Sequence, residues 1–439
     1  MEEAVQKPFR YRTIVWKQFR RNKPALFSVY VLIFMAVLAL LAPLLANNRP
    51  LYVKYRGETF FPALSLRQTM ILKTDSGVEE INPEVFDWKQ LKLDAVIWAP
   101  VPYAPGKADY LNSNFARPLG EQKFLKDGKM VPIPSRFRHW LGTGSRGDDL
   151  LAGLIHGARI SMTIGFISMT VASIIGIIIG MLAGFLGDGG LIISRGKFFM
   201  IIIGLFFAWF YAFQVRTGIL ESGLQNQSGG FLFQFLVSLV IFSAILFLFF
   251  QLGKIVEKIS WLNRKFPVPA DTLLSRVIEI FVSLPIFLLI ITIAAMSRSS
   301  LTTVMIIIGL TNWTGIARLT RAEMLRIRNL EYIQSARALG FTSRRIMLRH
   351  ALPNAIAPAL VSISFGVANA ILIESALSFI GIGVPPTITT WGSLINEGRE
   401  NFSAWWMIVF PGLCILITVL AFNLIGEGLR DALDPKLKK

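Results

Sequence analysis

Residues 231–252 read FLFQFLVSLVIFSAILFLFFQL, a run without a single charged side chain. A helix needs about 20 consecutive apolar residues to cross the hydrocarbon core of a bilayer, so this run is long enough for one crossing. Comparable runs recur along the chain. The expected spans are 25–46, 158–186, 198–214, 231–252, 278–297, 299–318, 354–376 and 404–426. The sequence therefore predicts an all-α polytopic membrane protein.

The overall composition agrees with this class. Of 439 residues, 53% are hydrophobic and only 16% are charged, whereas a soluble domain carries roughly a quarter of its residues as charged side chains. This excludes a disordered chain, a collagen-like chain and most soluble enzymes. Cys414 is the only cysteine, so the chain has no intrachain disulfide and no cysteine-based metal site.

The net charge of +18 would suggest a nucleic-acid partner in a soluble protein. Here the basic residues gather in short segments on one side of the expected spans. The segment 318–350 is rich in arginine, whereas the short loops 215–230 and 377–403 contain only Arg216 and Arg399 as basic residues. Because cytoplasmic loops collect Lys and Arg, both termini are expected in the cytoplasm, and no nucleic-acid partner is expected.

The segment 47–157 is rich in proline, and its basic and acidic residues are nearly balanced. Such a composition is typical of a small extracytoplasmic domain rather than a linker. No trio of nucleophile, base and orienting group stands out in it, which disfavours a membrane-bound enzyme. His139 and His156 lie near its end without Cys, Asp or His partners at ligand spacing, so a metal site is not expected there.

The segment 318–353 reads RLTRAEMLRIRNLEYIQSARALGFTSRRIMLRHALP. Two helical stretches are expected on either side of Gly340, the first over about 322–339 with apolar residues at three-residue steps. Gly340 can turn the chain sharply, and Thr342 can cap the second helix. The spacing alone leaves two interpretations open. The loop is either a basic amphipathic hairpin on the lipid headgroups or a rigid knob that docks into a soluble partner.

This loop resembles the EAA loop of binding-protein-dependent ABC importers. The consensus of that loop is Glu-Ala-Ala, three residues, Gly, nine residues, Ile, one residue and Leu-Pro. The matching positions here are Gln334, Ser335, Ala336, Gly340, His350, Leu352 and Pro353. Gln334, Ser335 and His350 depart from the consensus residues, whereas the turn glycine and the Leu-Pro pair are kept. The resemblance implies that these residues, together with Glu331 and Phe341, form a loop that couples the chain to an ATPase.

Three further stretches are similar to the dipeptide, oligopeptide and nickel permeases of the C type. They are HWLGTGSRGDDLLAGLIHGARISM (139–162), ESALSFIGIGVPPTITTWGSLINEG (374–398) and PGLCILITVLAFNLIGEGLRDALDPKLK (411–438). In the first stretch, Gly144 and Asp148 replace an Asp and an Arg of the family pattern. The resemblance implies the permease core of a type I ABC importer. Because such permeases usually have six spans, residues 197–252 are expected to be an extra two-helix hairpin that faces lipid.

The resemblance also implies an organisation along the chain, in a bacterial cytoplasmic (inner) membrane. The expected parts are a cytoplasmic segment (1–24), a first span (25–46), an extracytoplasmic domain (47–157), a second span (158–196), the extra hairpin (197–252), the permease core (253–426) with its coupling loop (318–353), and a cytoplasmic tail (427–439).

The partners implied by the resemblance are a homologous second permease subunit, two cytoplasmic ABC ATPase subunits and an extracytoplasmic substrate-binding protein, in addition to membrane lipid. The chain contains no G-x-x-x-x-G-K-[ST] motif, so ATP and Mg are expected on the partner ATPases. The chain itself is expected to bind no metal or cofactor and not to be an enzyme. Peptides are the expected cargo, and nickel or another small solute is the alternative.

Polar side chains inside spans are costly and often functional. Glu374 is the clearest example, and Ser362, Asn369 and Asn423 are further candidates for the transport pathway or for hydrogen bonds between helices. For Glu374 a structural partner and a substrate contact remain equally open. A proton-coupled secondary transporter would need a relay of ionisable residues, and Glu374 alone lies deep in a span. Pro285 is expected to kink the span 278–297.

Overall fold

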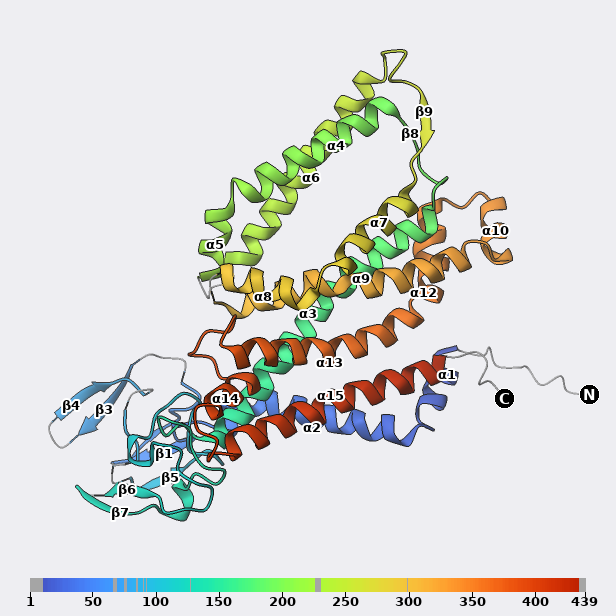
Figure 1. Cartoon of the computed structure of the whole chain (residues 1–439). Helices are drawn as coiled ribbons and strands as arrows, with labels where there is room; N and C mark the ends of the chain where they lie inside the picture. The colour runs from blue at the N-terminus through green and yellow to red at the C-terminus, as the bar shows by residue number, and fades with distance from the viewer. Residues whose placement is uncertain are drawn as a thin grey trace, which may run out of the picture. The chain divides into compact units, whose positions relative to one another are not determined.

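The computed structural model describes most of the chain. The described residues are 11–65, 69–74, 77–83, 86–89, 91, 93–126, 128–225, 230–297 and 299–433. They form two compact units, residues 1–169 with 363–439, and residues 170–362. The chain is mostly helical, which confirms the predicted class of an all-α polytopic membrane protein (Figure 1). The end of the predicted cytoplasmic tail and the polar turn near Asn226 lie outside the described residues.

In the first unit, the N-terminal and C-terminal helices pack against each other (Figure 1). The helices are α1 (Tyr11–Phe19), α2 (Lys23–Leu45), α14 (Trp391–Gly398) and α15 (Trp406–Leu433). Asn22 caps α2 by accepting a hydrogen bond from the Ala25 backbone N–H at 3.1 Å, and its side chain donates to Asp431 on α15 at 3.3 Å. Helix α13 (Ala357–Ile380) precedes α14 in the chain.

The segment predicted to be extracytoplasmic contains short antiparallel strands. A three-stranded sheet has the order β2-β1-β5, and two hairpins are formed by β3 with β4 and by β6 with β7. The elements are β1 (Tyr52–Tyr55), β2 (Glu58–Phe60), β3 (Met70–Thr74), β4 (Gly77–Ile81), β5 (Ala95–Ile97), β6 (Lys123–Lys126), β7 (Lys129–Pro132) and the one-turn helices η1 (Tyr110–Asn112) and η2 (Ser135–Phe137). Val53, Tyr55, Ile81 and Trp88 form a small buried core. This segment is therefore a folded domain with its own core.

Helix α3 (Leu150–Leu186) corrects the predicted boundaries 47–157 and 158–196. The helix begins at Leu150 because the Asp149 carboxylate accepts a hydrogen bond from the Ala152 backbone N–H at 2.7 Å and so caps the first turn. It ends at Leu186, where Gly187 takes a positive φ of +58°. The chain then forms β8 (Ile192–Ser194), which pairs with β9 (Lys265–Pro267).

In the second unit, the segment predicted as an extra hairpin consists of two long helices that lie side by side, drawn in green (Figure 1). The elements are α4 (Arg195–Trp209), a π-helical turn η3 (Phe210–Gln214), α5 (Thr217–Gln225) and α6 (Gly230–Val256). Lys197 forms an ion pair with Glu257 at 2.7 Å at one end, and Arg216 donates to Gln234 at 2.6 Å near the other. Many large apolar side chains point outward from both helices.

The span predicted over 278–297 with a kink at Pro285 is two helices in the structure. It consists of α7 (Ala270–Ser283) and α8 (Ile286–Met296), which meet at an angle of 78°. The break falls at Leu284 and Pro285, because a proline ring clashes with a continuing helix and lacks the N–H. The predicted kink is confirmed, and it is sharper than a bend within one helix. Helix α9 (Leu301–Ile327) is longer than the predicted 299–318 and extends into the segment predicted as the coupling loop.

Among the residues that the structure describes, six helices are long and apolar enough to cross a membrane. They are Lys23–Leu45, Leu150–Leu186, Arg195–Gln214, Phe233–Val256, Ala357–Ile380 and Trp406–Leu433, and the bent pair α7–α8 makes a seventh if it counts as one span. Helix α9 is more polar than these. It covers the sixth predicted span, 299–318, and is not one of the six.

Candidate functional site

The loop predicted to couple the chain to an ATPase folds into a compact knob, residues 331–355. Its elements are α10 (Glu331–Ala338), α11 (Ser343–Arg345), a π-helical turn η4 (Ile346–Ala351) and α12 (Leu352–Ala355). The single helix predicted over 322–339 is wrong, because α9 ends at Ile327 and Leu330 has an extended backbone before α10 begins. The break allows Ile327 and Ile333 to enter the same core, while Leu330 stays 37% exposed.

The knob has its own hydrophobic core within the second unit. Ile333, Ala336 and Ile346 of the knob are buried together with Met324 and Ile327 at the end of α9. The C-terminal end of α3 contributes Met181 and Phe185 to the same cluster. The apolar face that the sequence placed along this loop is therefore buried inside the unit.

Gly340 forms the turn predicted for it, with a φ of +79°. The Gly340 N–H donates to the Arg337 carbonyl at 2.9 Å, and the Phe341 N–H donates to the Ala336 carbonyl at 3.2 Å. This pair of hydrogen bonds is the Schellman ending of a helix, which favours glycine at the left-handed position. The predicted cap is confirmed too, because Thr342 Oγ1 accepts from the Arg345 N–H at 3.4 Å.

The nine residues of the predicted coupling site lie together on the knob, at different depths. Glu331, Gln334, Ser335, Gly340 and Pro353 are exposed, Phe341, His350 and Leu352 are half-buried, and Ala336 is buried. The half-buried rings pack against each other, with Phe341 stacked on His350 at a centroid distance of 6.0 Å. The exposed residues thus form a surface supported by packed side chains.

Sequence reasoning missed an apolar residue at the tip of the knob. Leu339 is 74% exposed, directly before the turn glycine, and Tyr332 and Leu348 are 43% and 44% exposed on the same knob. Leu339 continues the three-residue steps after Ala336, so the signal for its exposure was its position directly before the turn glycine Gly340. Exposed apolar side chains on a rigid element are typical of a protein interaction surface.

Glu374 is fully buried and held by hydroxyl groups of the first unit. Ser161 donates to Oε2 at 3.1 Å and Ser378 donates to Oε1 at 2.7 Å, and the Thr390 side chain also hydrogen-bonds the carboxyl group. These groups belong to α3, α13 and the N-cap of α14. Of the two interpretations left open by the sequence, the geometry favours the structural partner. The other candidates differ in depth, since Ser362 and Asn423 are half-buried and Asn369 is exposed.

Two substitutions separate the structural role of Glu374 from a role in transport. Glu374→Gln keeps the size and an acceptor oxygen, so near-normal uptake and stability are expected. Glu374→Ala leaves Ser161, Ser378 and Thr390 without their partner and opens a cavity, which is expected to lower the free energy of unfolding by about 2–5 kcal/mol. Thermal unfolding of the purified permease in detergent and uptake measure the two effects. Lost uptake at normal stability in Glu374→Gln would instead assign the carboxylate to the pathway.

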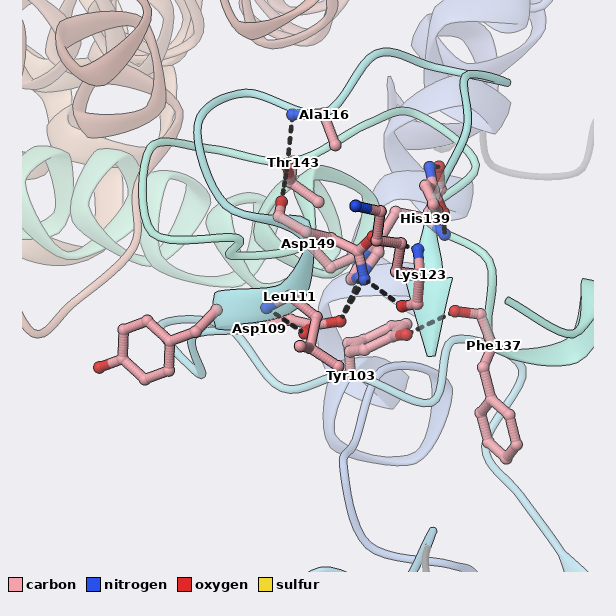
Figure 2. Close-up of polar contacts among 12 residues, drawn as sticks. Tyr103, Asp109, Leu111, Ala116, Lys123, Phe137, His139, Thr143 and Asp149 are labelled. Atoms are coloured by element: carbon pink, nitrogen blue, oxygen red, sulfur yellow. Dashed lines mark hydrogen bonds and ion pairs between the residues drawn. The ribbon is translucent and has the colours of Figure 1, made fainter. Parts of the chain in front are cut away.

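The segment predicted to be extracytoplasmic contains an acid–histidine–acid cluster, which Figure 2 shows. His139 is fully buried; its Nδ1 lies 2.8 Å from Asp149 Oδ2, and its Nε2 lies 3.1 Å from Asp109 Oδ2. The ring stacks on Tyr103 at 4.0 Å, and the Tyr103 hydroxyl donates to the Phe137 carbonyl. The sequence offered no partner of His139 at metal-ligand spacing, and the two carboxylates that contact the ring lie 10 and 30 residues away along the chain.

Sharp turns at glycines bring these partners together. Gly142 and Gly147 have φ angles of +85° and +88°, which glycine adopts without strain. A Cβ at Gly147 would overlap the Asp109 backbone, with 2.6 Å to its carbonyl carbon. Asp149 in the same cluster caps α3, so the cluster ties the extracytoplasmic domain to the first turn of that helix.

Lys89 also belongs to this cluster, with its Nζ 3.6 Å above the Tyr103 ring. Burial lowers the pKa of Lys89 to about 8, against the attraction of Asp109, Asp87 and Asp149. Burial alone would lower the pKa of His139, but its hydrogen bonds to Asp109 and Asp149 outweigh burial and raise that pKa. Both ring nitrogens are engaged by carboxylates. Among the described residues, no group of three His, Cys, Asp or Glu side chains is arranged to hold a metal ion.

The raised pKa of His139 predicts a pH dependence of stability. The protonated ring stabilises the folded domain fully below its unfolded pKa of 6.5, and this contribution is lost as the pH rises through the higher folded value. His139→Asn leaves the buried Asp149 carboxylate and the half-buried Asp109 carboxylate without their cation, which costs about 3–5 kcal/mol. The difference in thermal stability between the wild type and His139→Asn should therefore be largest below pH 6.5 and shrink in alkaline buffer. Equal differences from pH 5 to 9 would mean that His139 stays neutral.

Thr143 and Gly144 hold the stretch 139–162 against neighbouring segments. Thr143 Oγ1 donates to the Asn112 carbonyl at 2.7 Å and accepts from the Ala116 N–H at 2.9 Å. The indole N–H of Trp406 donates to the Thr143 carbonyl at 3.2 Å, which joins the stretch to α15. Gly144, which replaces the aspartate of the family pattern, leaves room for Glu397, and Glu397 accepts from the Ser145 N–H at 2.7 Å.

Two protein families match this chain. Residues 259–439 match the binding-protein-dependent transport system inner membrane component, and residues 11–62 match the N-terminal TM domain of oligopeptide transport permease C. The first match contains the whole knob. The second contains α1 and α2.

Three curated relatives illustrate the range of similarity. A putative peptide transport system permease protein of Brucella suis is 46% identical over 169 residues, 38% of this chain and 57% of that protein. The di/tripeptide transport system permease protein DppC of Pseudomonas aeruginosa is 32% identical over 69% of this chain and 73% of its own length. The inner membrane ABC transporter permease protein YejE of Escherichia coli is 26% identical over 96% of both chains.

The chain thus aligns with little more than half of the Brucella protein, but with nearly the whole of YejE and nearly three quarters of the di/tripeptide permease. The buried core of the knob, its turn at Gly340 and these matches agree. The chain belongs to the family of inner membrane permease components of binding-protein-dependent transport systems.

Proposed function

We propose that this protein is one permease subunit of an ABC importer and forms half of its translocation pathway. The knob is the element through which partner ATPases act on the permease. Peptides are the proposed cargo, since the relatives reported above include permeases named for peptide and di/tripeptide transport.

This proposal rests on where the apolar residues of the loop lie. A hairpin lying on lipid headgroups would turn its apolar face to the membrane. Here Ile333, Ala336 and Ile346 are buried in the core of the unit, and the exposed apolar side chains of the knob are Leu339 at its tip with Tyr332 and Leu348. This arrangement supports the docking interpretation of the loop over the lipid interpretation.

The remaining parts of the importer follow from this role. A homologous second permease subunit completes the pathway, two cytoplasmic ATPases bind ATP and Mg, and an extracytoplasmic binding protein delivers the cargo. This chain then transmits motion and performs no hydrolysis of its own. In this arrangement both termini and the knob face the cytoplasm of the cell, and the Asp109–His139–Asp149 cluster faces the outside.

Reconstitution in proteoliposomes tests the proposal. The permease pair, the ATPases and the extracytoplasmic binding protein, called the receptor below, are assembled in the vesicles. ATP is supplied on the side of the membrane where the ATPases lie, and uptake of a labelled peptide mixture is followed. Uptake that requires both ATP and the receptor supports the proposal. Uptake driven by an ion gradient without ATP would contradict it, and uptake of nickel in place of peptides would overturn the proposed cargo.

A further inference from the structure

A row of three glycines on α3 brings that helix into backbone contact with α9. Gly176, Gly180 and Gly184 are spaced four residues apart, so they lie along one face of the helix. A Cβ at Gly176 would lie 2.7 Å from the Trp313 carbonyl oxygen, and a Cβ at Gly180 would overlap the Ala317 carbonyl. Glycines at this spacing allow helices in a membrane to approach to backbone distance. We call these three residues the glycine seam.

The seam reaches the base of the knob. A Cβ at Gly184 would lie 2.5 Å from the Arg321 carbonyl oxygen and 2.6 Å from Met324 Cβ. Met324 is also a member of the buried core of the knob. The same stretch of α9 therefore contacts the seam on one side and supports the knob on the other.

A pair of charged side chains fixes α9 to a third helix. The Arg321 guanidinium bonds both carboxylate oxygens of Asp271, the first acidic residue of α7, with 2.7 Å between Nη2 and Oδ2. The two side chains are 26% and 15% exposed, so the pair is largely shielded from water. A bidentate arginine–carboxylate pair fixes orientation as well as distance.

The start of α7 is in turn held by the turn that follows α3. Asp188 accepts hydrogen bonds from the Thr272 N–H at 2.9 Å and from the Thr272 hydroxyl at 2.8 Å. The three helices α3, α7 and α9 are thereby connected at the same level of the second unit, next to the knob.

We propose that the glycine seam and the Asp271–Arg321 pair are positioning elements for coupling. They join α9 to the end of α3 and to the start of α7 as one rigid unit, so that a displacement of the knob moves all three helices. This inference rests on the proposed function of the knob. The proposed role of these residues is to hold α9 at a defined distance and angle.

The geometry explains why a small change here shifts the knob. A methyl group at Gly184 would meet backbone atoms, which cannot move aside by changing a rotamer. Helix α9 must then move away from α3, and the knob moves with it because Met324 belongs to both contacts. Gly315, on the same helix α9, has open space where its Cβ would be, so Gly315→Ala is a matched control.

The test uses the complete importer in proteoliposomes and measures peptide transported per ATP hydrolysed. Gly184→Ala is expected to lower this ratio about 2- to 30-fold, the range found for substitutions that alter coupling between sites. Gly315→Ala is expected to keep the wild-type ratio. A purely structural defect would reduce the amount of assembled complex and leave the ratio unchanged, and that result would overturn the proposal.

Variants of the charged pair keep the test decisive if Gly184→Ala fails to assemble. Asp271→Asn and Arg321→Gln should each lower the ratio without adding bulk. The exchanged pair Asp271→Arg with Arg321→Asp should restore part of it. Unchanged ratios in both single variants would contradict the proposal. Absence of ATP-dependent uptake in the wild type would contradict the proposed function itself, whereas normal wild-type uptake with unaffected variants would contradict only this inference.

Discussion

Replacing Leu339 with glutamate is expected to abolish ATP-driven uptake while the permease remains folded. Leu339 is 74% exposed at the tip of the knob, so the substitution disturbs no buried core. An apolar anchor at the centre of a protein interface contributes about 2 kcal/mol or more, which corresponds to about 30-fold weaker binding of the partner. A buried, unpaired glutamate adds a further desolvation penalty. Copurification of the ATPases with the tagged permease, together with uptake, measures the effect.

A matched control shows that any loss is specific to the knob. Leu64, in the extracytoplasmic domain, is 60% exposed. Leu64→Glu changes the same side chain at similar exposure and should leave copurification of the ATPases unchanged. Full copurification and normal uptake by Leu339→Glu would show that the tip of the knob is not the docking surface.

The second large effect is expected at Gly147, where Ala should destabilise the extracytoplasmic domain strongly. Gly147 has a φ of +88°, which costs an L-residue about 1–2 kcal/mol. Its Cβ would also overlap the Asp109 backbone, and such overpacking costs about 1–3 kcal/mol more. Because Asp109 holds His139, the shift would loosen the whole acid–histidine–acid cluster. Limited proteolysis of the full-length protein in detergent reports the loss of folded domain.

A variant at Gly106 separates the cost of the positive φ from the cost of overlap with the Asp109 backbone. Gly106 has a positive φ of +70°, but nothing lies within 4 Å of the position of its Cβ. Gly106→Ala should therefore show only the backbone cost, and Gly147→Ala should be cut much faster. Equal cutting rates for the two variants would mean that the approach of Gly147 to Asp109 contributes nothing to stability.

The parts of the fold that follow from local patterns could be predicted from the sequence. The apolar runs predicted the membrane-spanning helices, since their length and composition are decisive on their own. The turn at Gly340 and the cap at Thr342 were also predictable, because each depends on the residue's own conformational preference. The break at Pro285 belongs to the same group, although its angle of 78° does not follow from the proline alone.

Features that depend on contacts between distant residues escaped prediction. His139 had no acidic neighbour in the sequence, and its carboxylate partners appear only once the turns at Gly142 and Gly147 are formed. The continuous helix expected over 322–339 was wrong because burial of Ile333 against the end of α3 outweighs helix continuity. A regular apolar spacing could not reveal this competition.

The start of α3 shows a similar limit. The hydropathy of the span suggested residue 158, but the helix begins at Leu150 because Asp149 caps it. The glycine seam, in contrast, was visible as three glycines at four-residue spacing and was overlooked. Such a pattern within an apolar run is a usable sign of close helix packing. Its partner helix, α9, could be identified only from the structure.

A single-cysteine cross-linking experiment tests the central claim, that the knob is held by ATPase subunits in the cytoplasm. Cys414 is the only cysteine, so replacing it with Ala and Leu339 with Cys leaves one thiol at the tip of the knob. In intact cells, position 339 should resist a membrane-impermeant thiol reagent and cross-link to an ATP-hydrolysing subunit. Labelling of position 339 from outside, or an absence of any cross-link to such a subunit in the assembled complex, would contradict the account.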